Sequence, residues 1–203
     1  MVKDGIYYAA GFVAAGIFVS WLTRPALGIP LYLLALFCLY FFRDPDRKIP
    51  SGPVAVSPAD GKVVAIVPES GLTRISVFLN IFDVHVNRSP IAGKIVGVHY
   101  QKGKFLVASR ENASVQNEQN AVTVESADGV RVIFKQIAGL IARRIVFRKN
   151  IGDRVGTGDR IGLIKFGSRV DILFGGEWEI AVAAGQRVSA GSSIIARRRG
   201  AAA

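Results

Sequence analysis

The sequence offers few residues that could act together as a nucleophile and its base. A glycine-serine pair, Gly167-Ser168, interrupts an apolar strand pattern over residues 165–173, and the chain has two histidines, His85 and His99. A serine hydroxyl becomes a nucleophile when a neighbouring base accepts its proton. A Gly-Ser pair in a strand is, however, more often a bulge or bend, and a lone histidine in a strand is more often a packed residue. Taken alone, these residues leave the structural and the chemical interpretations open.

Other familiar site patterns are missing from the sequence. It has no zinc-ligand spacing, phosphate-binding loop, dinucleotide fingerprint or aromatic-basic RNA motif, so no metal is expected. Its single cysteine, Cys38, lies in an apolar run, which argues against an intrachain disulfide framework. The net charge of +11 at pH 7 predicts a polyanionic partner. The apolar N-terminus favours a membrane surface for that role, and no nucleic-acid partner is expected.

The first part of the chain is strongly apolar. Two uncharged runs, residues 5–22 and 26–42, are separated by a short segment that contains Arg24, and each is near the lower limit of about 17–25 residues for a membrane-spanning helix. We predict a two-helix membrane hairpin over residues 1–48. The basic residues that follow it place the rest of the chain on the cytoplasmic side of the cell (inner) membrane. The alternative is a pair of buried helices in a soluble protein, which rarely lack polar residues on every face.

Residues 49–203 are expected to form a mainly β domain. Short β-branched runs such as residues 63–67, 75–79 and 130–134 are bounded by turn residues, and no long amphipathic helix is evident. A pattern Gly-x-x-Val-x-x-Gly-x-x-Ile starts at Gly152 and recurs from Gly185. Such glycines suit tight turns with positive φ between short strands. The pattern resembles the hairpins of biotinyl and lipoyl domains, so we predict a barrel-sandwich architecture.

Four sequence blocks resemble those of the phosphatidylserine decarboxylases, in particular the short bacterial and archaeal form. The blocks occur in the family's order, and together with the apolar N-terminus they cover nearly the whole chain. They are FFRDPDR at 41–47, SPADGKV at 57–63, FLNIFDVHVNRSP at 78–90 and FGSRVD at 166–171.

The resemblance implies a self-processing enzyme. In the family the glycine-serine bond breaks itself, which here would give a β chain of residues 1–167 and an α chain of residues 168–203. Ser168 would become a covalent pyruvoyl cofactor, whose ketone forms a Schiff base with phosphatidylserine and accepts the electrons released as carbon dioxide leaves. The product would be phosphatidylethanolamine. Implied partners are phosphatidylserine, anionic membrane lipid and the two chains of one precursor, with a homo-oligomer left open.

The resemblance also suggests roles for two further residues. His85 falls where the family keeps a histidine, and Asp60 matches the family's acidic member of the cleavage site, although an aspartate before glycine is also an ordinary turn residue. Many members have a second histidine three residues after the first, where this chain has Arg88. We therefore predict Ser168, His85 and Asp60 as catalytic residues, and leave open whether His85 serves cleavage, reprotonation or both.

Two alternatives to this function remain at the level of sequence. One is a pyruvoyl decarboxylase of a free amino acid, against which the apolar N-terminus argues. The other is a non-enzymatic membrane adaptor built on a lipoyl-like domain. That adaptor would not explain Gly167-Ser168 and His85 in their family contexts. A carrier of the lipoyl kind would also need a lysine at a hairpin tip between the repeats, and the sequence has no lysine there in the Met-Lys-Met or Asp-Lys-Ala setting of such carriers.

Overall fold

The computed structural model describes residues 1–108, 112–140, 144–165 and 167–200. Two compact units make up the chain, Met1–Asp46 and Arg47–Ala203. Phe166 of the fourth sequence block and the basic residue Arg143 lie outside the described residues.

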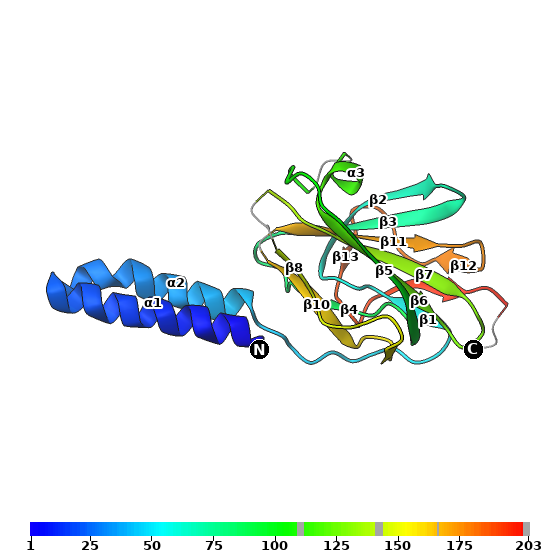
Figure 1. The fold of residues 1–203 in the computed structure, drawn as a ribbon. Coiled ribbons are helices and arrows are strands. Elements are labelled where there is room, and N and C mark those ends of the chain that lie inside the picture. Colours follow the sequence, from blue (N-terminus) through cyan, green and yellow to red (C-terminus); the bar gives the residue numbers. More distant parts are fainter. Residues whose placement is uncertain (109–111, 141–143, 166, 201–203) are drawn as a thin grey trace. The chain divides into compact units, whose positions relative to one another are not determined.

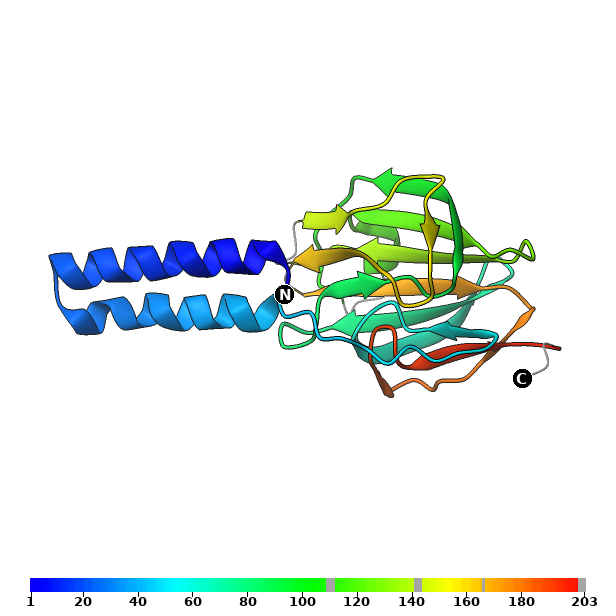
Figure 2. The ribbon, with the colours of Figure 1, turned by 90° about the horizontal axis from the view of Figure 1, so that it is seen from below.

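The first unit is a pair of antiparallel helices, α1 (Lys3–Leu22) and α2 (Pro25–Phe41), which lie side by side (Figure 2). Pro25 starts α2 at a position where a proline costs no hydrogen bond. Small residues let the two helices approach closely. A Cβ added to Gly16 would lie 2.6 Å from the Tyr32 ring, and one added to Gly28 would lie 2.7 Å from the Gly16 carbonyl oxygen. The α1 helix is long and apolar enough to cross a membrane, whereas α2 has 17 residues.

The second unit is built from short strands. The first seven are β1 (Val54–Val56), β2 (Gly61–Glu69), β3 (Leu72–Leu79), β4 (Val86–Arg88), β5 (Gly93–Gln101), β6 (Gln119–Glu125) and β7 (Arg131–Ile137). The others are β8 (Arg144–Phe147), β9 (Arg154–Val155), β10 (Arg160–Lys165), β11 (Ser168–Phe174), β12 (Trp178–Ile180), β13 (Arg187–Val188) and β14 (Ile194–Arg198). One short helix, α3 (Ala113–Gln116), precedes β6. The prediction of a mainly β domain is therefore confirmed, while its barrel-sandwich type stays a prediction.

The strands form one large sheet and two small ones. A curled sheet of eight strands has the order β13-β2-β3-β11-β7-β6-β5-β9 (Figure 1). The small sheets have the orders β1-β14-β12 and β4-β10-β8. The main core lies between them, since it combines residues such as Val77 and Phe134 of the large sheet with Ile164 and Ile195 of the small ones.

Strand β11 holds a central place in this arrangement. It pairs with β3 along its whole length, from Ser168 opposite Leu79 to Phe174 opposite Thr73, and with β7 on its other side. All seven of its residues are buried. One face of β11 contributes Val170 and Ile172 to the core, and the other face carries buried charges.

The two glycine repeats lie at opposite edges of the large sheet and have equivalent surroundings. As predicted, all four of their glycines, Gly152, Gly158, Gly185 and Gly191, have positive φ. Each repeat bonds to a separate Ser-Pro segment, because the Gly191 amide donates to the Ser57 carbonyl and the Gly158 amide donates to the Ser89 carbonyl. The valines of the repeats pair with the first residues of β2 and β5. The unit thus contains two copies of one strand-turn arrangement, which frame the central strands.

Candidate active site

The predicted nucleophile lies at the junction of two strands that belong to different sheets. Strand β10 ends at Lys165, and β11 begins at Ser168. Between them Gly167 has a φ of +63°, in the left-handed region that favours glycine. The Ser168 side chain is fully buried, and its hydroxyl oxygen has no hydrogen-bond partner among the described residues. Buried hydroxyls are nearly always paired, so this unpaired one marks a functional candidate.

His85 lies directly beside this junction and is 2 % exposed. Its Nδ1 is 2.9 Å from the Asp83 carbonyl oxygen, and its Nε2 is 3.2 Å from the Gly167 amide nitrogen. A carbonyl can only accept, so the network assigns the proton to Nδ1 and leaves a lone pair on Nε2 that accepts from the Gly167 N–H. The ring is thereby oriented with its basic nitrogen at Gly167, the residue before Ser168, which makes His85 a candidate general base.

Asp83, which the sequence analysis did not select, holds His85 in place through a tight turn. Its carboxylate accepts a hydrogen bond from the Asn80 amide at 2.9 Å and forms an ion pair with Arg187. The Asp83 amide donates back to the Asn80 carbonyl, which closes the turn. The Asp83 carbonyl is thus fixed for the His85 ring. The sequence signal for this role was an Asn-x-x-Asp turn just before the histidine.

Gly139 is a second residue that sequence reasoning missed. A Cβ at this position would lie 2.2 Å from the carbonyl oxygen of Gly167 and 3.3 Å from the Ala108 Cβ. No side chain fits at 2.2 Å from a backbone oxygen. Gly139 therefore lets its own backbone lie against the carbonyl next to Ser168.

A chain of buried amides lines the same face of the sheet as Ser168. The Asn120 Nδ2 donates to the Gln136 Oε1 at 3.1 Å, and the Gln136 Nε2 donates to the Asn87 Oδ1 at 2.9 Å. Gln136 pairs in register with Val170, two residues from Ser168 and on the same face of β11. The Asn87 Nδ2 at the end of the chain is buried and has no partner among the described residues. Polar groups of the protein interior thus lie on the face of the large sheet to which Ser168 belongs.

The opposite face of β11 anchors the segment that follows Ser168. The Arg169 Nε donates to the Asp171 Oδ1 at 2.6 Å, and Ser114 of α3 donates to the Asp171 Oδ2 at 2.6 Å. The Arg169 guanidinium also donates to the Ser76 hydroxyl at 2.6 Å. Arg169, Asp171 and Ser76 are all fully buried. Buried charges are kept only when they are paired. This network therefore holds in place the part of β11 that directly follows Ser168.

An apolar cavity of about 290 Å³ opens next to the junction. Gly167 forms part of its wall, and the other lining residues are Phe78, Asn80, Ile81, Val107, Ala108 and Leu140. Five of these six carry apolar side chains. The cavity therefore suits a hydrocarbon group at the Gly167-Ser168 bond.

The structure places the other predicted residues farther from Ser168. The two carboxylate oxygens of Asp60 accept hydrogen bonds from Arg47 and from the Ala190 amide, both at 2.7 Å. Asp60 precedes β2, which is separated from β11 by β3, a distance of about 10 Å at the usual strand spacing. A direct bond from Asp60 to His85 or Ser168 is not among those of the described residues.

Arg88 and His99 lie in surroundings that differ from those of His85. Arg88 is buried, and its guanidinium donates to the Gly158 carbonyl at 3.0 Å, in one of the glycine repeats. It therefore supports a turn where many family members have a second histidine. His99 lies exposed on β5, opposite Ala121.

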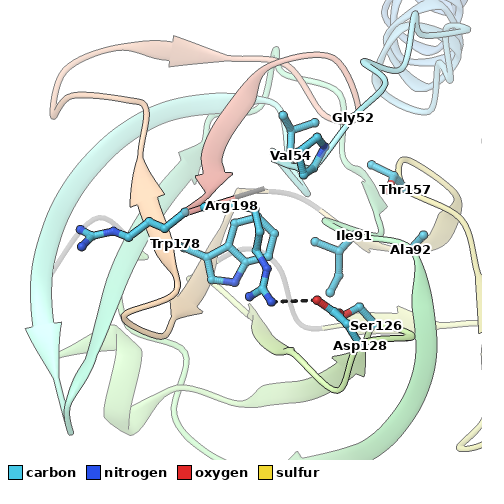
Figure 3. A pocket seen from close by; sticks show the side chains of 12 residues that line it. Gly52, Val54, Ile91, Ala92, Ser126, Asp128, Thr157, Trp178 and Arg198 are labelled. Carbon is cyan, nitrogen blue, oxygen red and sulfur yellow. Dashed lines mark hydrogen bonds and ion pairs between the residues drawn. The ribbon is translucent and has the colours of Figure 1, made fainter. Parts of the chain in front are cut away.

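A larger cavity of about 430 Å³ lies among β1, β12, β14 and the turn between β6 and β7 (Figure 3). Arg198 spans it, with its guanidinium 5.5 Å from the centre of the Trp178 ring and in an ion pair with Asp128. The hydrogen bond from Ser126, followed by the charge of Arg198, lowers the pKa of Asp128. No histidine is found among the described residues that line it, so it lacks an imidazole like the one of His85.

The fold and the site together define a mainly β protein in which a predicted nucleophile, a candidate base and an apolar cavity lie at one strand junction. Comparison with known proteins agrees with this class. Residues 34–196 match the sequence profile of the phosphatidylserine decarboxylase family. The chain is 71% identical over 198 residues to the phosphatidylserine decarboxylase proenzyme of Solibacter usitatus (strain Ellin6076), which covers 98% of this chain and 97% of that protein. It is 45% identical over 205 residues to the phosphatidylserine decarboxylase proenzyme of Rickettsia africae (strain ESF-5), covering 96% of this chain and 88% of that protein.

The chain therefore belongs to the phosphatidylserine decarboxylase family, a family of carbon-carbon lyases. The resemblance predicted from the four sequence blocks is confirmed, and so is the class of enzyme.

Proposed function

We propose that this chain is a proenzyme that cleaves itself between Gly167 and Ser168 and then decarboxylates phosphatidylserine to phosphatidylethanolamine. The observation that carries the proposal is the buried hydroxyl of Ser168, which has no partner among the described residues, next to a glycine whose amide bonds to the Nε2 of His85. Both relatives are named phosphatidylserine decarboxylase proenzymes, which supports the same reaction and the existence of a precursor.

Cleavage begins with the Ser168 hydroxyl, which attacks the carbonyl carbon of Gly167. The Nε2 of His85 accepts the hydroxyl proton, for which it exchanges its hydrogen bond with the Gly167 N–H. The carbon-oxygen bond forms as the carbon-nitrogen bond breaks, and the proton passes to the nitrogen of residue 168. Gly167 carries no side chain to hinder this approach, and the positive φ sets it apart from regular strand.

Elimination then releases the Gly167 carboxylate from residue 168, and hydrolysis with one water releases its nitrogen as ammonia, which leaves a pyruvoyl group. That group would supply the electron sink for decarboxylation once the substrate amine is bound to it. The protein around this position is suited to such a group, because the Ser168 hydroxyl is buried without a partner among the described residues and the His85 ring lies against the adjacent Gly167 amide. In each turnover His85 can take up a proton that the incoming substrate ammonium gives up, and it is placed to return this proton to the substrate after carbon dioxide leaves.

The apolar cavity supports a lipid rather than a free amino acid as substrate. Its walls at Phe78, Ile81, Val107 and Leu140 offer no charge to an amino acid side chain, but they fit the hydrocarbon part of a phospholipid. We assign Asp60 an indirect role, in which its bonds to Arg47 and Ala190 fix the start of β2.

The two helices of the first unit are the proposed membrane anchor. The α1 helix meets the length and composition needed to span a bilayer, and exposed side chains of both helices, such as Phe18, Leu33 and Leu36, are apolar. With basic residues after α2, the positive-inside rule favours a cytoplasmic location for the second unit.

Intact-mass measurement and activity on phosphatidylserine vesicles test the proposal together. We expect two chains, residues 1–167 and a chain of residues 168–203 that carries the pyruvoyl group, which reductive trapping with cyanoborohydride and substrate would tag. An active preparation that contains only the intact chain would overturn the mechanism.

A further inference from the structure

Four exposed apolar side chains surround the mouth of the cavity at Gly167. Ile81 is 37 % exposed, Phe82 59 %, Val107 40 % and Leu140 57 %. Ile81, Val107 and Leu140 also line the cavity itself. Single exposed apolar residues are ordinary, but a group of them around one opening marks an interaction site. We call these four residues the apolar rim.

The structure holds one side of the rim in a rigid turn. Ile81 and Phe82 lie between Asn80 and Asp83, and this turn is closed by the Asp83 carboxylate on the Asn80 amide at 2.9 Å and by the Asn80 side chain on the Phe82 amide at 2.7 Å. The turn is the same one that fixes the Asp83 carbonyl for His85. The exposure of Ile81 and Phe82 is therefore imposed by a turn that the site itself needs.

A buried asparagine holds the other side of the rim. Asn117 accepts from the Leu106 amide at 2.9 Å and donates to the Leu106 carbonyl at 2.9 Å and the Ala138 carbonyl at 2.7 Å. Leu106 adjoins Val107, and Ala138 lies two residues before Leu140. One side chain thus ties both segments together and keeps Val107 and Leu140 at the opening.

Basic side chains accompany the rim. Lys102 and Lys104 are exposed on the segment that leads to Val107, and Arg187 is 64 % exposed where it pairs with Asp83. Lysine and arginine side chains near an anionic bilayer strengthen binding to it. Apolar side chains flanked by cations match the interface of an anionic bilayer, where hydrocarbon lies beneath negatively charged headgroups.

We infer that the apolar rim inserts into the surface of an anionic bilayer, so that a lipid can move from the membrane into the cavity without crossing water. This inference rests on the proposed function for the identity of that lipid, but the contact itself does not depend on cleavage or turnover.

Single fluorescent labels test the contact. In full-length protein with Cys38→Ala, which removes the single native cysteine, we would introduce Ile81→Cys, Phe82→Cys or Leu140→Cys and attach an environment-sensitive nitrobenzoxadiazole group. Ile151→Cys is the matched control, because Ile151 is 63 % exposed and precedes Gly152, which bonds to Ile95 near the far end of β5. That end of β5 lies about 25 Å from the end that leads into the rim segment. Each protein is reconstituted into phosphatidylglycerol-phosphatidylcholine vesicles with and without doxyl-labelled lipid.

We expect doxyl lipid to quench the labels at positions 81, 82 and 140 and to leave the label at position 151 unchanged, in the Ser168→Ala background as well as in the parent. Quenching at all four positions, or at none of the rim positions, would overturn the inference. If the fluorescence of a rim label changes with protein concentration but not with doxyl lipid, the partner is a second copy of the chain, and this result would also overturn the inference. Absence of cleavage in the unlabelled parent with Ser168 intact, together with quenching at the rim, would contradict the proposed function alone.

Discussion

Gly139 and Gly167 meet backbone to backbone, so that a Cβ on residue 139 would lie 2.2 Å from the Gly167 carbonyl oxygen. This contact leads to the first prediction. Gly139→Ala should displace the Gly167 carbonyl, which is the proposed target of Ser168, and cleavage should fall sharply, since misplacement by about 1 Å can cost about 10²-fold. The measurement is the fraction of cleaved chain over time in freshly synthesised protein.

Gly97→Ala is the matched control. A Cβ on Gly97 would meet Thr123 at ordinary distances of 3.4–3.5 Å, and Gly97 also lies in a strand of the large sheet. This variant should cleave at the parental rate. If Gly139→Ala cleaves equally fast, the carbonyl does not need the position that the structure gives it.

The second prediction concerns Ser168 and His85. Ser168→Ala removes the nucleophile and should leave one intact, inactive chain. In His85→Ala, failure to cleave would identify His85 as the base for Ser168. Normal cleavage followed by turnover slowed by about 10²- to 10⁴-fold would instead identify it as the proton donor in turnover.

His85→Gln separates these roles from packing. Its amide can occupy part of the ring's space while it lacks a basic nitrogen, so we expect it to fold and to resemble His85→Ala in chemistry. Normal cleavage together with normal turnover in both variants would show that neither role belongs to His85.

The third prediction is about stability. Asp171→Asn leaves the buried Arg169 guanidinium without its full countercharge, and loss of one partner of a buried pair costs about 3–5 kcal/mol. The free energy of unfolding of the second unit should fall by that amount in denaturant titrations of the Ser168→Ala protein, which remains one chain. Asp128→Asn, at an ion pair whose carboxylate side chain is 60 % exposed, should change it by less than about 1 kcal/mol. Equal effects would mean that the Arg169-Asp171 pair is not a buried anchor.

The fourth prediction tests the anchor. Removal of residues 1–42 should release the remaining chain from sedimented membranes in high salt, because salt screens the attraction of basic side chains for anionic lipid. At low salt, part of the shortened protein should still bind anionic vesicles. Sedimentation that persists in high salt would mean that membrane attachment does not depend on the two helices.

Much of the fold could be predicted because its signals are local. Uncharged runs identified both helices, and β-branched runs between turn residues indicated a mainly β unit. The glycine repeat predicted the positive φ of Gly152 and Gly185, since a turn's backbone conformation depends on neighbours in the sequence.

The site could be predicted only in part, because its contacts join distant segments. Ser168 and His85 were found through sequence blocks that resemble a family. Two contacts of the site region, that of Gly139 with Gly167 and that of Asn117 with Ala138, follow from the order and register of β6, β7 and β11. No local sequence pattern reveals this order and register. The bonds of Asp60 to Arg47 and Ala190 likewise depend on a loop and a repeat far apart in the chain.

The position of β11 in the middle of the large sheet has a consequence for the life of the molecule. Residues 168–203 supply β11 and β13 to the large sheet, where they pair with β3, β7 and β2, and they supply β12 and β14 to the sheet of β1. The precursor can therefore refold as one chain, whereas the cleaved protein would unfold into two chains that must find each other again at a rate set by their concentration. Because residue 168 would then be a pyruvoyl group rather than a serine, the peptide bond between residues 167 and 168 could not be remade. Maturation would thus make unfolding irreversible in dilute solution, so that the durability of the mature protein would be set by how slowly it unfolds.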